Sequence, residues 1–347
     1  MKKLYVIAAC LLMVALVLGS FGCAKKPLAP APGEEWPAQI SIGSFVKASA
    51  SYPTNVAIAK LVGKYTPSSA IVREYAGGTP GIEALGRGDI DTWGIGQNDL
   101  YNAYYGTGFW EGKPKDIKLL IGTWYYGGIG FGVRPGEGIH TVKDLAGKKC
   151  MVRSFLPFQN RLVEQVMKYA GVWDKITVVE MASTADIAPM MIDKKIDCFW
   201  WSSGATFGLQ IKEAVGIDWI SLTPEEQEAG IKGIPGTVAW TAPAWILEMW
   251  DYPPDKVLRS TAYCFAIACR ADIPDFVAYG MLAAVYDDNH LDEVRVLSPD
   301  LTETTIELAV KHSWMPFHPG AVRYYEDKGV WTKEMEARQQ ELLAKPR

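Results

Sequence analysis

The feature that most constrains the fold is an alternation of short apolar strands with helices, which occurs twice along the chain. The first run predicts strands at 39–43, 71–75, 92–95 and 117–123, with helices at 53–65, 82–85 and 99–105. The second run predicts strands at 149–153, 176–180, 198–201 and 219–222, with helices at 158–170, 186–193 and 205–215. Strands that are joined through helices by short loops form parallel sheets with right-handed crossovers. The sequence therefore predicts two α/β lobes with a ligand cleft between them.

The last third of the chain has another pattern, in which a strand-rich stretch to residue 271 precedes helices at 274–286, 302–312 and 333–345. We expect this part to return to the first lobe. The first lobe would then comprise 39–130 and 236–347, and the second lobe 131–235. Glycine tolerates the φ/ψ changes that hinges require. We expect a hinge near 130–134 and 234–238, where the glycines are Gly130, Gly132, Gly233 and Gly236.

The amino terminus has the pattern of a secretory signal. A positive start, Met1-Lys2-Lys3, precedes an apolar run from Leu4 to Leu18 that is short for a membrane span. Gly19-Ser20-Phe21-Gly22-Cys23 resembles a bacterial lipoprotein cleavage site, although Leu is usual where Ser20 stands. We expect residues 1–23 to be the signal peptide and Cys23 to carry lipid, with ordinary cleavage before Cys23 as the alternative. The Pro/Ala-rich segment 24–38 would tether a periplasmic protein to a membrane.

Composition excludes some classes of partner. The 347 residues include 35 Lys and Arg against 39 Asp and Glu, for a net charge of -4. Neither half of the chain is strongly basic, so nucleic acid is not expected as a partner. The length suits two ordinary domains. We expect a monomer.

Four cysteines lie beyond the signal region, and none forms a CxxC pair, so zinc and redox motifs are not indicated. Cys150 and Cys198 take matching places on two expected strands of the second lobe. A disulfide between them is compatible with this placement, but the sequence favours buried free thiols.

The sequence carries no recognisable catalytic motif. The four histidines, at 140, 290, 312 and 318, lack metal-ligand spacing such as HxH or HExxH. There is no GxSxG elbow, and no GxxxxGK[ST] follows Gly77-Gly78. We therefore expect a binding protein without cofactor or metal, not an enzyme.

In open α/β lobes, ligands bind at the carboxyl ends of the strands, where helix N-termini present backbone N–H groups. These ends supply hydroxyl donors, basic groups and large aromatic rings. The candidate ligand-binding residues are Ser44, Phe45, Lys47, Ser49, Ser51, Tyr52, Gln97, Asn98, Trp124, Tyr125, Arg153, Ser154, Phe155, Gln159, Arg161, Thr184, Trp200, Trp201 and Ser202.

This mixture suits a ligand with an anionic head and an apolar or aromatic body. Arg153 is the favoured partner of the head group, although it could instead pair with a surface carboxylate. Lys47 could be a solvated loop charge, and Arg161 could face either the cleft or solvent. Trp200 and Trp201 are adjacent in a strand, so at most one of them lines the cleft.

Several segments together resemble the TAXI-type solute receptors of tripartite ATP-independent periplasmic (TRAP) transporters. The most specific are Gly88-Asp89-Ile90-Asp91 with Asn98-Asp99, the turn Asp144-Leu145-Ala146-Gly147-Lys148, and His318-Pro319-Gly320-Ala321 with Tyr324-Tyr325. The resemblance extends over residues 39–331.

The resemblance implies a two-lobed periplasmic-binding-protein type II fold that closes on a small organic anion and delivers it to a membrane permease. The family's ligands include glutamate-like and other carboxylates. The family's usual first loop is Gly/Thr-rich, whereas this chain has SFVKASASYP, and VRSFLPFQN stands where a Gly/Ser-rich loop is usual. These bulky and basic residues favour an aromatic or larger carboxylate. The alternative function is a ligand-sensing subunit for a membrane histidine kinase.

Overall fold

The computed structural model describes residues 30–47, 49, 51–153, 157–181, 183–202 and 206–347, with the backbone alone at 157, 184, 201, 202 and 206. Residues 36–347 form one compact unit. The signal peptide and Cys23 lie outside the described residues. Within the described part, none of the helices is long and apolar enough to cross a membrane.

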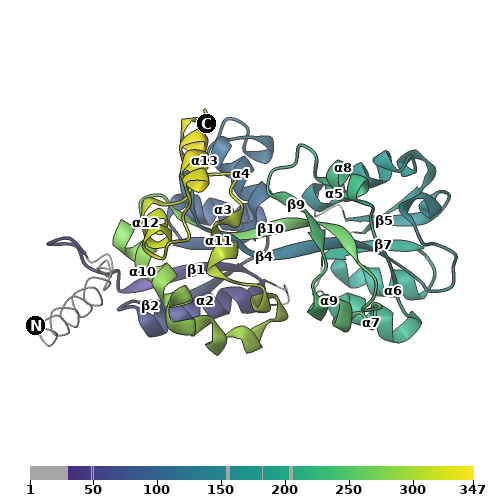
Figure 1. Ribbon diagram of the computed structural model, residues 1–347, viewed down its shortest axis with the longest axis horizontal. Coiled ribbons are helices and arrows are strands. Elements are labelled where there is room, and N and C mark those ends of the chain that lie inside the picture. The colour runs from purple at the N-terminus through teal and green to yellow at the C-terminus, as the bar shows by residue number, and fades with distance from the viewer. Residues whose placement is uncertain (1–29, 48, 50, 154–156, 182, 203–205) are drawn as a thin grey trace, which may run out of the picture. The chain divides into compact units, whose positions relative to one another are not determined.

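Lobe 1 is built on a five-stranded sheet in the order β2-β1-β3-β10-β4 (Figure 1). β1 pairs in parallel with β2 and β3, whereas β10 pairs antiparallel with β3 and β4. Its first elements are β1 (Gln39–Phe45), α2 (Tyr52–Tyr65), β2 (Ser69–Tyr75), α3 (Gly78–Arg87), β3 (Thr92–Gly96) and α4 (Gln97–Tyr105). The expected strands and helices are confirmed here, except that α3 continues through Gly86 and ends at Gly88, whose φ of 80° suits glycine.

Lobe 2 continues the same sheet in the order β4-β7-β5-β6, with β5 parallel to β6 and β7. Its strands are β5 (Lys149–Arg153), β6 (Thr177–Met181), β7 (Cys198–Ser202), β8 (Asp218–Ile220) and β9 (Thr237–Thr241). Its helices are α5 (Pro157–Tyr169), α6 (Ile187–Ile192), α7 (Thr206–Val215), α8 (Pro224–Ile231) and α9 (Ala244–Met249). The two-lobed α/β fold expected from the sequence is confirmed.

Two long antiparallel strands connect the lobes. β4 (Ile117–Val133) pairs with β10 (Arg259–Arg270) along most of its length and then with β7 and β8 in lobe 2. The strand expected at 117–123 therefore continues ten residues further. In Figure 1 the two strands run through the middle of the molecule from one lobe to the other.

The glycines of β4 make room for aromatic rings. A Cβ added at Gly127, Gly128 or Gly132 would lie under 3.0 Å from the ring of Tyr263, Trp240 or Phe199, respectively. None of these glycines has a positive φ. Close packing therefore explains their presence in the strand, and the hinge expected near 130–134 stays a prediction.

The chain stays in lobe 2 beyond the boundary expected at residue 235. Trp240, Ala242, Ile246, Trp250 and Leu258 share one hydrophobic core with the residues of β5, β7 and α5. Lobe 2 thus includes β9, α9 and the start of β10, because these large apolar side chains are buried in its core. The return to lobe 1 occurs along β10.

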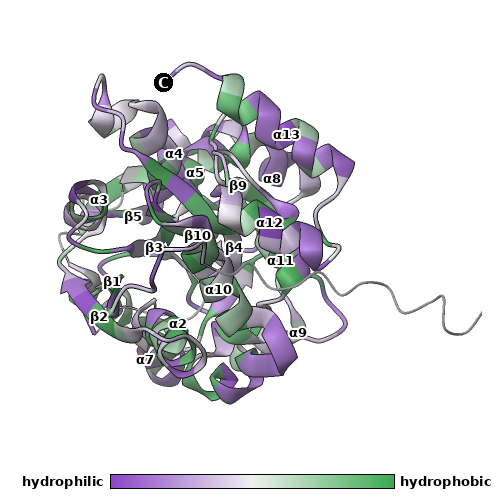
Figure 2. Cartoon of the chain, turned by 90° about the vertical axis from the view of Figure 1, so that its left-hand side faces the viewer, coloured by the Kyte–Doolittle hydropathy of each residue, from purple (hydrophilic) through white to green (hydrophobic). Residues whose placement is uncertain are grey.

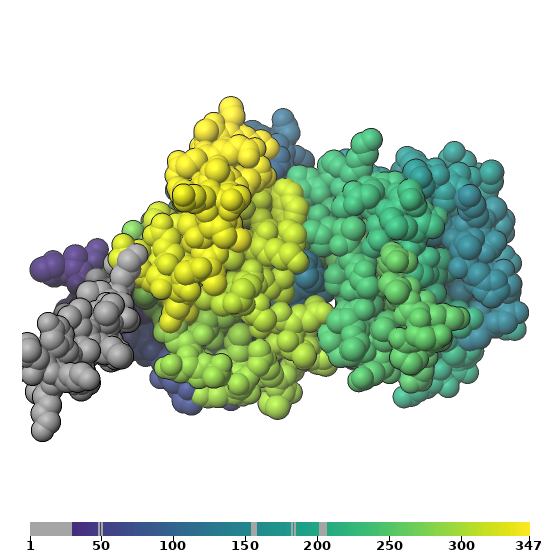
Figure 3. Space-filling view, in the orientation of Figure 1, coloured from purple at the N-terminus to yellow at the C-terminus, as the bar shows by residue number. Residues whose placement is uncertain are grey.

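The carboxyl-terminal helices pack on elements of lobe 1. They are α10 (Asp275–Tyr286), α11 (Ile306–Lys311), α12 (Pro319–Asp327) and α13 (Lys333–Ala344). α10 packs on α2 and α12, and α11 packs on β4. Figure 3 shows this end of the chain, in yellow, covering one side of the lobe, and Figure 2 shows apolar β10 inside and polar stretches on α12 and α13.

All four cysteines of the described part are free and buried, which decides between the two alternatives for Cys150 and Cys198. The two residues are opposite one another on the parallel strands β5 and β7. The neighbouring thiol of Cys150, together with burial, raises the pKa of Cys198. The Cys198 thiol is therefore protonated at neutral pH, and both cysteines are core side chains.

Candidate ligand-binding site

Arg153 ends strand β5, and its side chain is buried against aromatic rings. Only 5% of the residue is exposed. Its Nη2 donates to the carbonyl of Trp200 at 2.9 Å, and its guanidinium lies 4.5 Å from the Trp200 ring centroid and 5.4 Å from that of Phe207. Asn160 on α5 clamps the Arg153 backbone by accepting from its N–H at 3.0 Å and donating to its carbonyl. The strand end and the first turns of α5 thus fix the position of this cation.

No carboxylate among the described residues forms an ion pair with Arg153, and its Nε has no hydrogen-bond partner among them. Burial lowers the pKa of Arg153 to about 10, and the phenol of Tyr263 acts in the opposite direction. The guanidinium is still charged at neutral pH. A buried charge without a counter-charge is costly, so such a group marks a candidate site for an anion.

The lobes meet at the end of strand β3. A Cβ added at Gly96 would lie 3.4 Å from Cδ2 of Tyr263, 3.8 Å from Oδ2 of Asp99 and 3.8 Å from Cε1 of Phe158. Asp99 is in the first turn of α4 in lobe 1, Phe158 is on α5 in lobe 2, and Tyr263 is on the connecting strand β10. We call Gly96, Asp99, Phe158 and Tyr263 the inter-lobe site.

Sequence reasoning found Arg153 but missed Asp99, Phe158 and Tyr263. Asp99 follows directly on two candidates, Gln97 and Asn98, and could have been included as the third residue of the same helix. Phe158 lies between the candidates Phe155 and Gln159. Tyr263 had no local signal, because only the antiparallel pairing of β10 with β4 brings it between the lobes.

Gln97 and Asn98 lie at this place, but their side chains bind the protein itself. Gln97 is fully buried, donates to the carbonyls of Gly122 and His312, and accepts from the Trp314 N–H at 3.1 Å. Asn98 donates to the Pro235 carbonyl at 3.2 Å. These contacts hold α4 to neighbouring loops. Because both side chains are used in this way, we propose a ligand-binding role only for the backbone N–H groups of Gln97 and Asn98.

Trp124, Tyr125 and Trp200 are core residues. Their exposed fractions are 0%, 4% and 1%. Tyr125 stacks on Phe265 at 4.6 Å, and Trp124 packs edge-to-face with Tyr286. The expectation that Trp124 and Tyr125 open into a cleft is not met, because β4 continues through both residues and is covered on its two faces. Trp200 contributes indirectly, as the surface on which Arg153 lies.

Among the described residues of the first loop, no cation is free of a partner. Lys47 has a side chain that is 74% exposed and lies 3.8 Å from Glu74, which is a surface ion pair. Ser44 is fully buried and accepts from Asn55 Nδ2 at 3.1 Å. The hydroxyls of Ser49 and Ser51 contact each other at 3.2 Å. Many of the polar side chains of this loop thus already bond to other groups of the protein.

The other candidates are less informative. Phe45 packs on Trp93 at 5.1 Å, and Tyr52 begins α2. Gln159 has a side-chain oxygen without a partner among the described residues, and Arg161 is exposed. Ser154 and Phe155 lie outside the described residues, as do the side chains of Thr184, Trp201 and Ser202.

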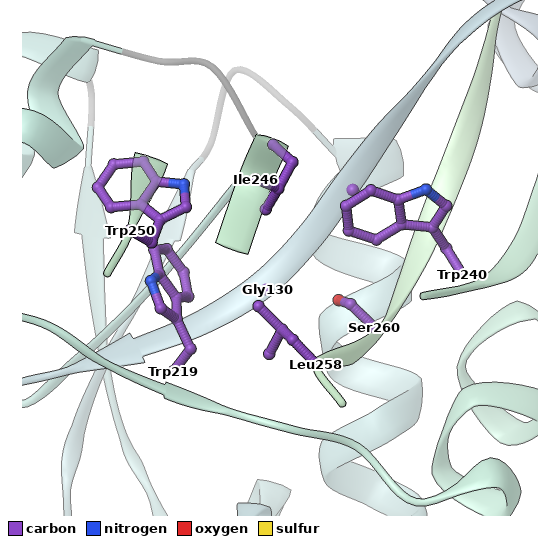
Figure 4. A pocket seen from close by; sticks show the side chains of 8 residues that line it. Gly130, Trp219, Trp240, Ile246, Trp250, Leu258 and Ser260 are labelled. Atoms are coloured by element: carbon purple, nitrogen blue, oxygen red, sulfur yellow. The ribbon is translucent and has the colours of Figure 1, made fainter. Parts of the chain in front are cut away.

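A small apolar cavity lies elsewhere, inside lobe 2 (Figure 4). Its lining residues are Gly128, Gly130, Trp219, Trp240, Ile246, Trp250, Leu258 and Ser260. Its volume of about 20 Å³ could hold one water molecule. The Ser260 hydroxyl already donates to the Ile129 carbonyl. This cavity is too small and too apolar for an organic anion.

Asp300 is a buried carboxyl group on a short 3-10 turn, Pro299–Thr302. It is 5% exposed, and its hydrogen bond from Ser298 Oγ is long, at 3.5 Å. Burial raises the pKa of Asp300 to about 7, and the negative charge of Glu303 acts in the same direction. Folding therefore favours the protonated form of this group.

The stabilising effect of this protonation is complete below about pH 4 and is lost as the pH rises through 7. Asp300→Asn cannot ionise, so its free energy of unfolding should rise relative to wild type between pH 4 and pH 8. We expect a change on the order of 2 kcal/mol, less than the full pKa shift implies, because proteins relax around buried charge. Urea unfolding across this pH range measures it, with the exposed Asp255→Asn as control. Parallel pH profiles of Asp300→Asn and wild type would contradict the assignment.

The fold and the inter-lobe site together define a class: a two-lobed α/β protein whose lobes share one continuous sheet, with strands that cross between the lobes. The chain belongs to the NMT1-like family, whose model matches residues 45–329.

Solved structures with a similar fold include the periplasmic aliphatic sulphonate binding protein SsuA from Escherichia coli. That similarity has 13% identity and a TM-score of 0.49, and it covers 90% of this chain and 94% of that one. The substrate-binding domain 2 of GlnP from Lactococcus lactis, in an open conformation, has 10% identity and a TM-score of 0.45, and the similarity covers 81% and 98%.

Proposed function

We propose that this chain is an extracytoplasmic solute-binding protein that captures a small organic anion between its lobes and delivers it to a membrane transporter. The observation that carries the proposal is Arg153, a cation that is 95% buried at a strand end and lacks a carboxylate partner among the described residues. A ligand carboxylate would supply the missing counter-charge. Arginine offers a planar fork of donors that suits such a group.

The surroundings of Arg153 favour a ligand with an apolar or aromatic body. Trp200 and Phe207 flank the guanidinium, and Phe158 and Tyr263 lie 6.2 Å apart as an edge-to-face pair. Aromatic rings provide large apolar contact area with few rotatable bonds. An aromatic or larger carboxylate therefore fits better than a very small acid.

Two finer parts of the proposal rest on the sequence alone. The resemblance to TAXI-type receptors favours a TRAP permease as the partner that accepts the ligand. The cleavage-site pattern favours a lipid anchor on Cys23, which intact-mass analysis of membrane-extracted protein would detect. In this proposal the chain binds and releases its ligand unchanged and carries out no catalysis.

Calorimetry and thermal unfolding with a panel of small acids test the proposal. The panel contains aromatic carboxylates, dicarboxylates and benzenesulfonate, each acid with and without an α-amino group, and the matching neutral amides. At about 100 times its dissociation constant, a bound acid should stabilise the protein by about 2.7 kcal/mol. The neutral amide should bind at least about tenfold more weakly, because it lacks the charge for Arg153. Failure of every anion to bind, or equal binding of the amide, would overturn the proposal.

A further inference from the structure

We infer that a chain of side-chain hydrogen bonds along helix α4 couples the junction of the two lobes to a surface loop, residues 106–112. The chain begins at the carbonyl of Pro235 and passes through Asn98 and Asn102. It ends at Thr107, the second residue of the loop. The inference concerns a conformational device of the fold, so it goes beyond the proposed function and does not depend on it.

The first hydrogen bond of the chain joins the two lobes. Asn98 is in the first turn of α4 in lobe 1, is 7% exposed, and donates through Nδ2 to the Pro235 carbonyl at 3.2 Å. Pro235 follows Ile234, a residue of the lobe 2 core. The next residue, Gly236, has a φ of 80°, and a Cβ added there would lie 2.5 Å from the backbone nitrogen of Asn98. The loop from lobe 2 thus packs directly on the start of α4, and a displacement of lobe 2 there breaks this bond.

The second and third hydrogen bonds connect α4 to the loop. Nδ2 of Asn102 donates to Oδ1 of Asn98 at 3.2 Å, and the i, i+4 spacing places these two side chains next to each other on the helix. The Thr107 hydroxyl donates to Oδ1 of Asn102 at 2.9 Å. A Cβ added at Gly108 would lie 3.6 Å from Cγ of Asn102, so the same amide also packs against the loop. Asn102 is therefore the link between the helix and the loop.

The chain has a fixed direction, because the carbonyl of Pro235 can only accept a hydrogen bond. Asn98 must turn its NH2 group to this carbonyl, which leaves its oxygen for Asn102. Asn102 must then turn its own NH2 group to Asn98 and its oxygen to Thr107. A side-chain amide has two such orientations, which exchange donor and acceptor. When the Pro235 bond breaks, Asn98 is free to turn over, and Asn102 has to turn with it. The two amides are thus the two-state element that coupling between distant sites requires.

The loop at the far end of the chain exposes an aromatic ring. Gly106, Gly108 and Gly112 have φ values of 63°, 59° and 67°, which favour glycine. Phe109 is 76% exposed and packs edge-to-face on Trp110 at 5.1 Å, whereas Trp110 is 4% exposed. A change in the order of this loop therefore changes the apolar surface that lobe 1 presents to solvent.

A competing explanation is that each of these hydrogen bonds stabilises only its own turn of α4. In that case, a substitution at one end of the chain would loosen the adjacent residues, or destabilise the whole protein evenly. It would not act selectively on the other end of the helix, about two turns away.

Amide hydrogen exchange of the whole chain at pH 7, followed by mass spectrometry, tests the coupling. Asn98→Ala should speed exchange of the amides in 107–113 by at least about tenfold relative to wild type. Because coupling free energies are reciprocal, Thr107→Val should speed exchange in 234–238 by at least about threefold. Strand β1 is the internal reference, since an even loss of stability would speed exchange there as well.

Thr237→Val is the matched control. The Thr237 hydroxyl donates to the Ile234 carbonyl at 2.6 Å, so this variant removes a side-chain bond from the same lobe 2 loop but not from the chain. Exchange in 107–113 should stay within about twofold of wild type. The inference fails if Asn98→Ala leaves 107–113 unchanged, or if Thr237→Val loosens this loop as much. If Asn98→Ala does not fold, the partly exposed Thr107→Val decides alone, and unchanged exchange in 234–238 then overturns the inference.

Discussion

Arg153→Ala is expected to weaken binding of the best anion by about 30- to 5,000-fold, which corresponds to about 2–5 kcal/mol. The reason is that truncation leaves the ligand's anionic group buried without a counter-charge, beside Trp200 and Phe207. Calorimetric titration with the tightest acid of the panel measures the loss. The variant should fold, because no carboxylate of the described part depends on Arg153 as its partner.

Two further variants sharpen this experiment. Arg153→Lys should recover part of the affinity, because it restores the charge but not the planar fork of donors. Arg161→Ala is the matched control, since Arg161 is an exposed arginine on the adjoining helix α5 and was itself a candidate from the sequence. If Arg153→Ala binds within about threefold of wild type while the control also binds normally, the anion site is elsewhere.

Gly320→Ala is expected to lower the free energy of unfolding by about 3 kcal/mol. Gly320 is in the first turn of α12, and an added Cβ would lie under 3.0 Å from the backbone of Asp275. Backbone atoms cannot move aside as a flexible side chain can, so helices α12 and α10 would have to separate. Urea unfolding followed by circular dichroism measures the change.

Gly63→Ala provides the matched control for this substitution. Gly63 is inside helix α2, and an added Cβ there would meet Ala70 at 3.5 Å, an ordinary van der Waals distance. Alanine is the better helix former, so this variant should be neutral or slightly more stable. A Gly320→Ala protein as stable as Gly63→Ala would show that the close approach of α12 to α10 is not required.

Local sequence patterns were sufficient to predict the lobes, because each strand and helix there has its own apolar period and its own boundary residues. Residues 149–153 alternate with the helix at 158–170 as the sequence predicts, and this placed Arg153 at a strand end before a helix. The length of β4 was not predictable in the same way. Gly127 and Gly128 resemble a turn until Tyr263 and Trp240 are known to cover them.

The candidate site was predicted only in part, for a related reason. The sequence identifies strand ends, but it does not show which polar side chains the protein uses for its own structure. Gln97 binds carbonyls from residues 122 and 312, and the second of these is more than 200 positions away. Asp99, two residues further along the same helix, has no ion pair among the described residues. Only long-range packing distinguishes these two residues.

The pairing of β4 with β10 also limits how the lobes can move. Two hydrogen-bonded strands form a narrow ribbon that flexes readily perpendicular to its face, whereas sliding one strand along the other would break the ladder. Opening and closing should therefore bend this ribbon in one direction, and the lobes should not rotate freely about it. Ligand-binding groups of the two lobes, on opposite sides of this ribbon, would therefore approach a captured molecule along nearly the same path in every cycle.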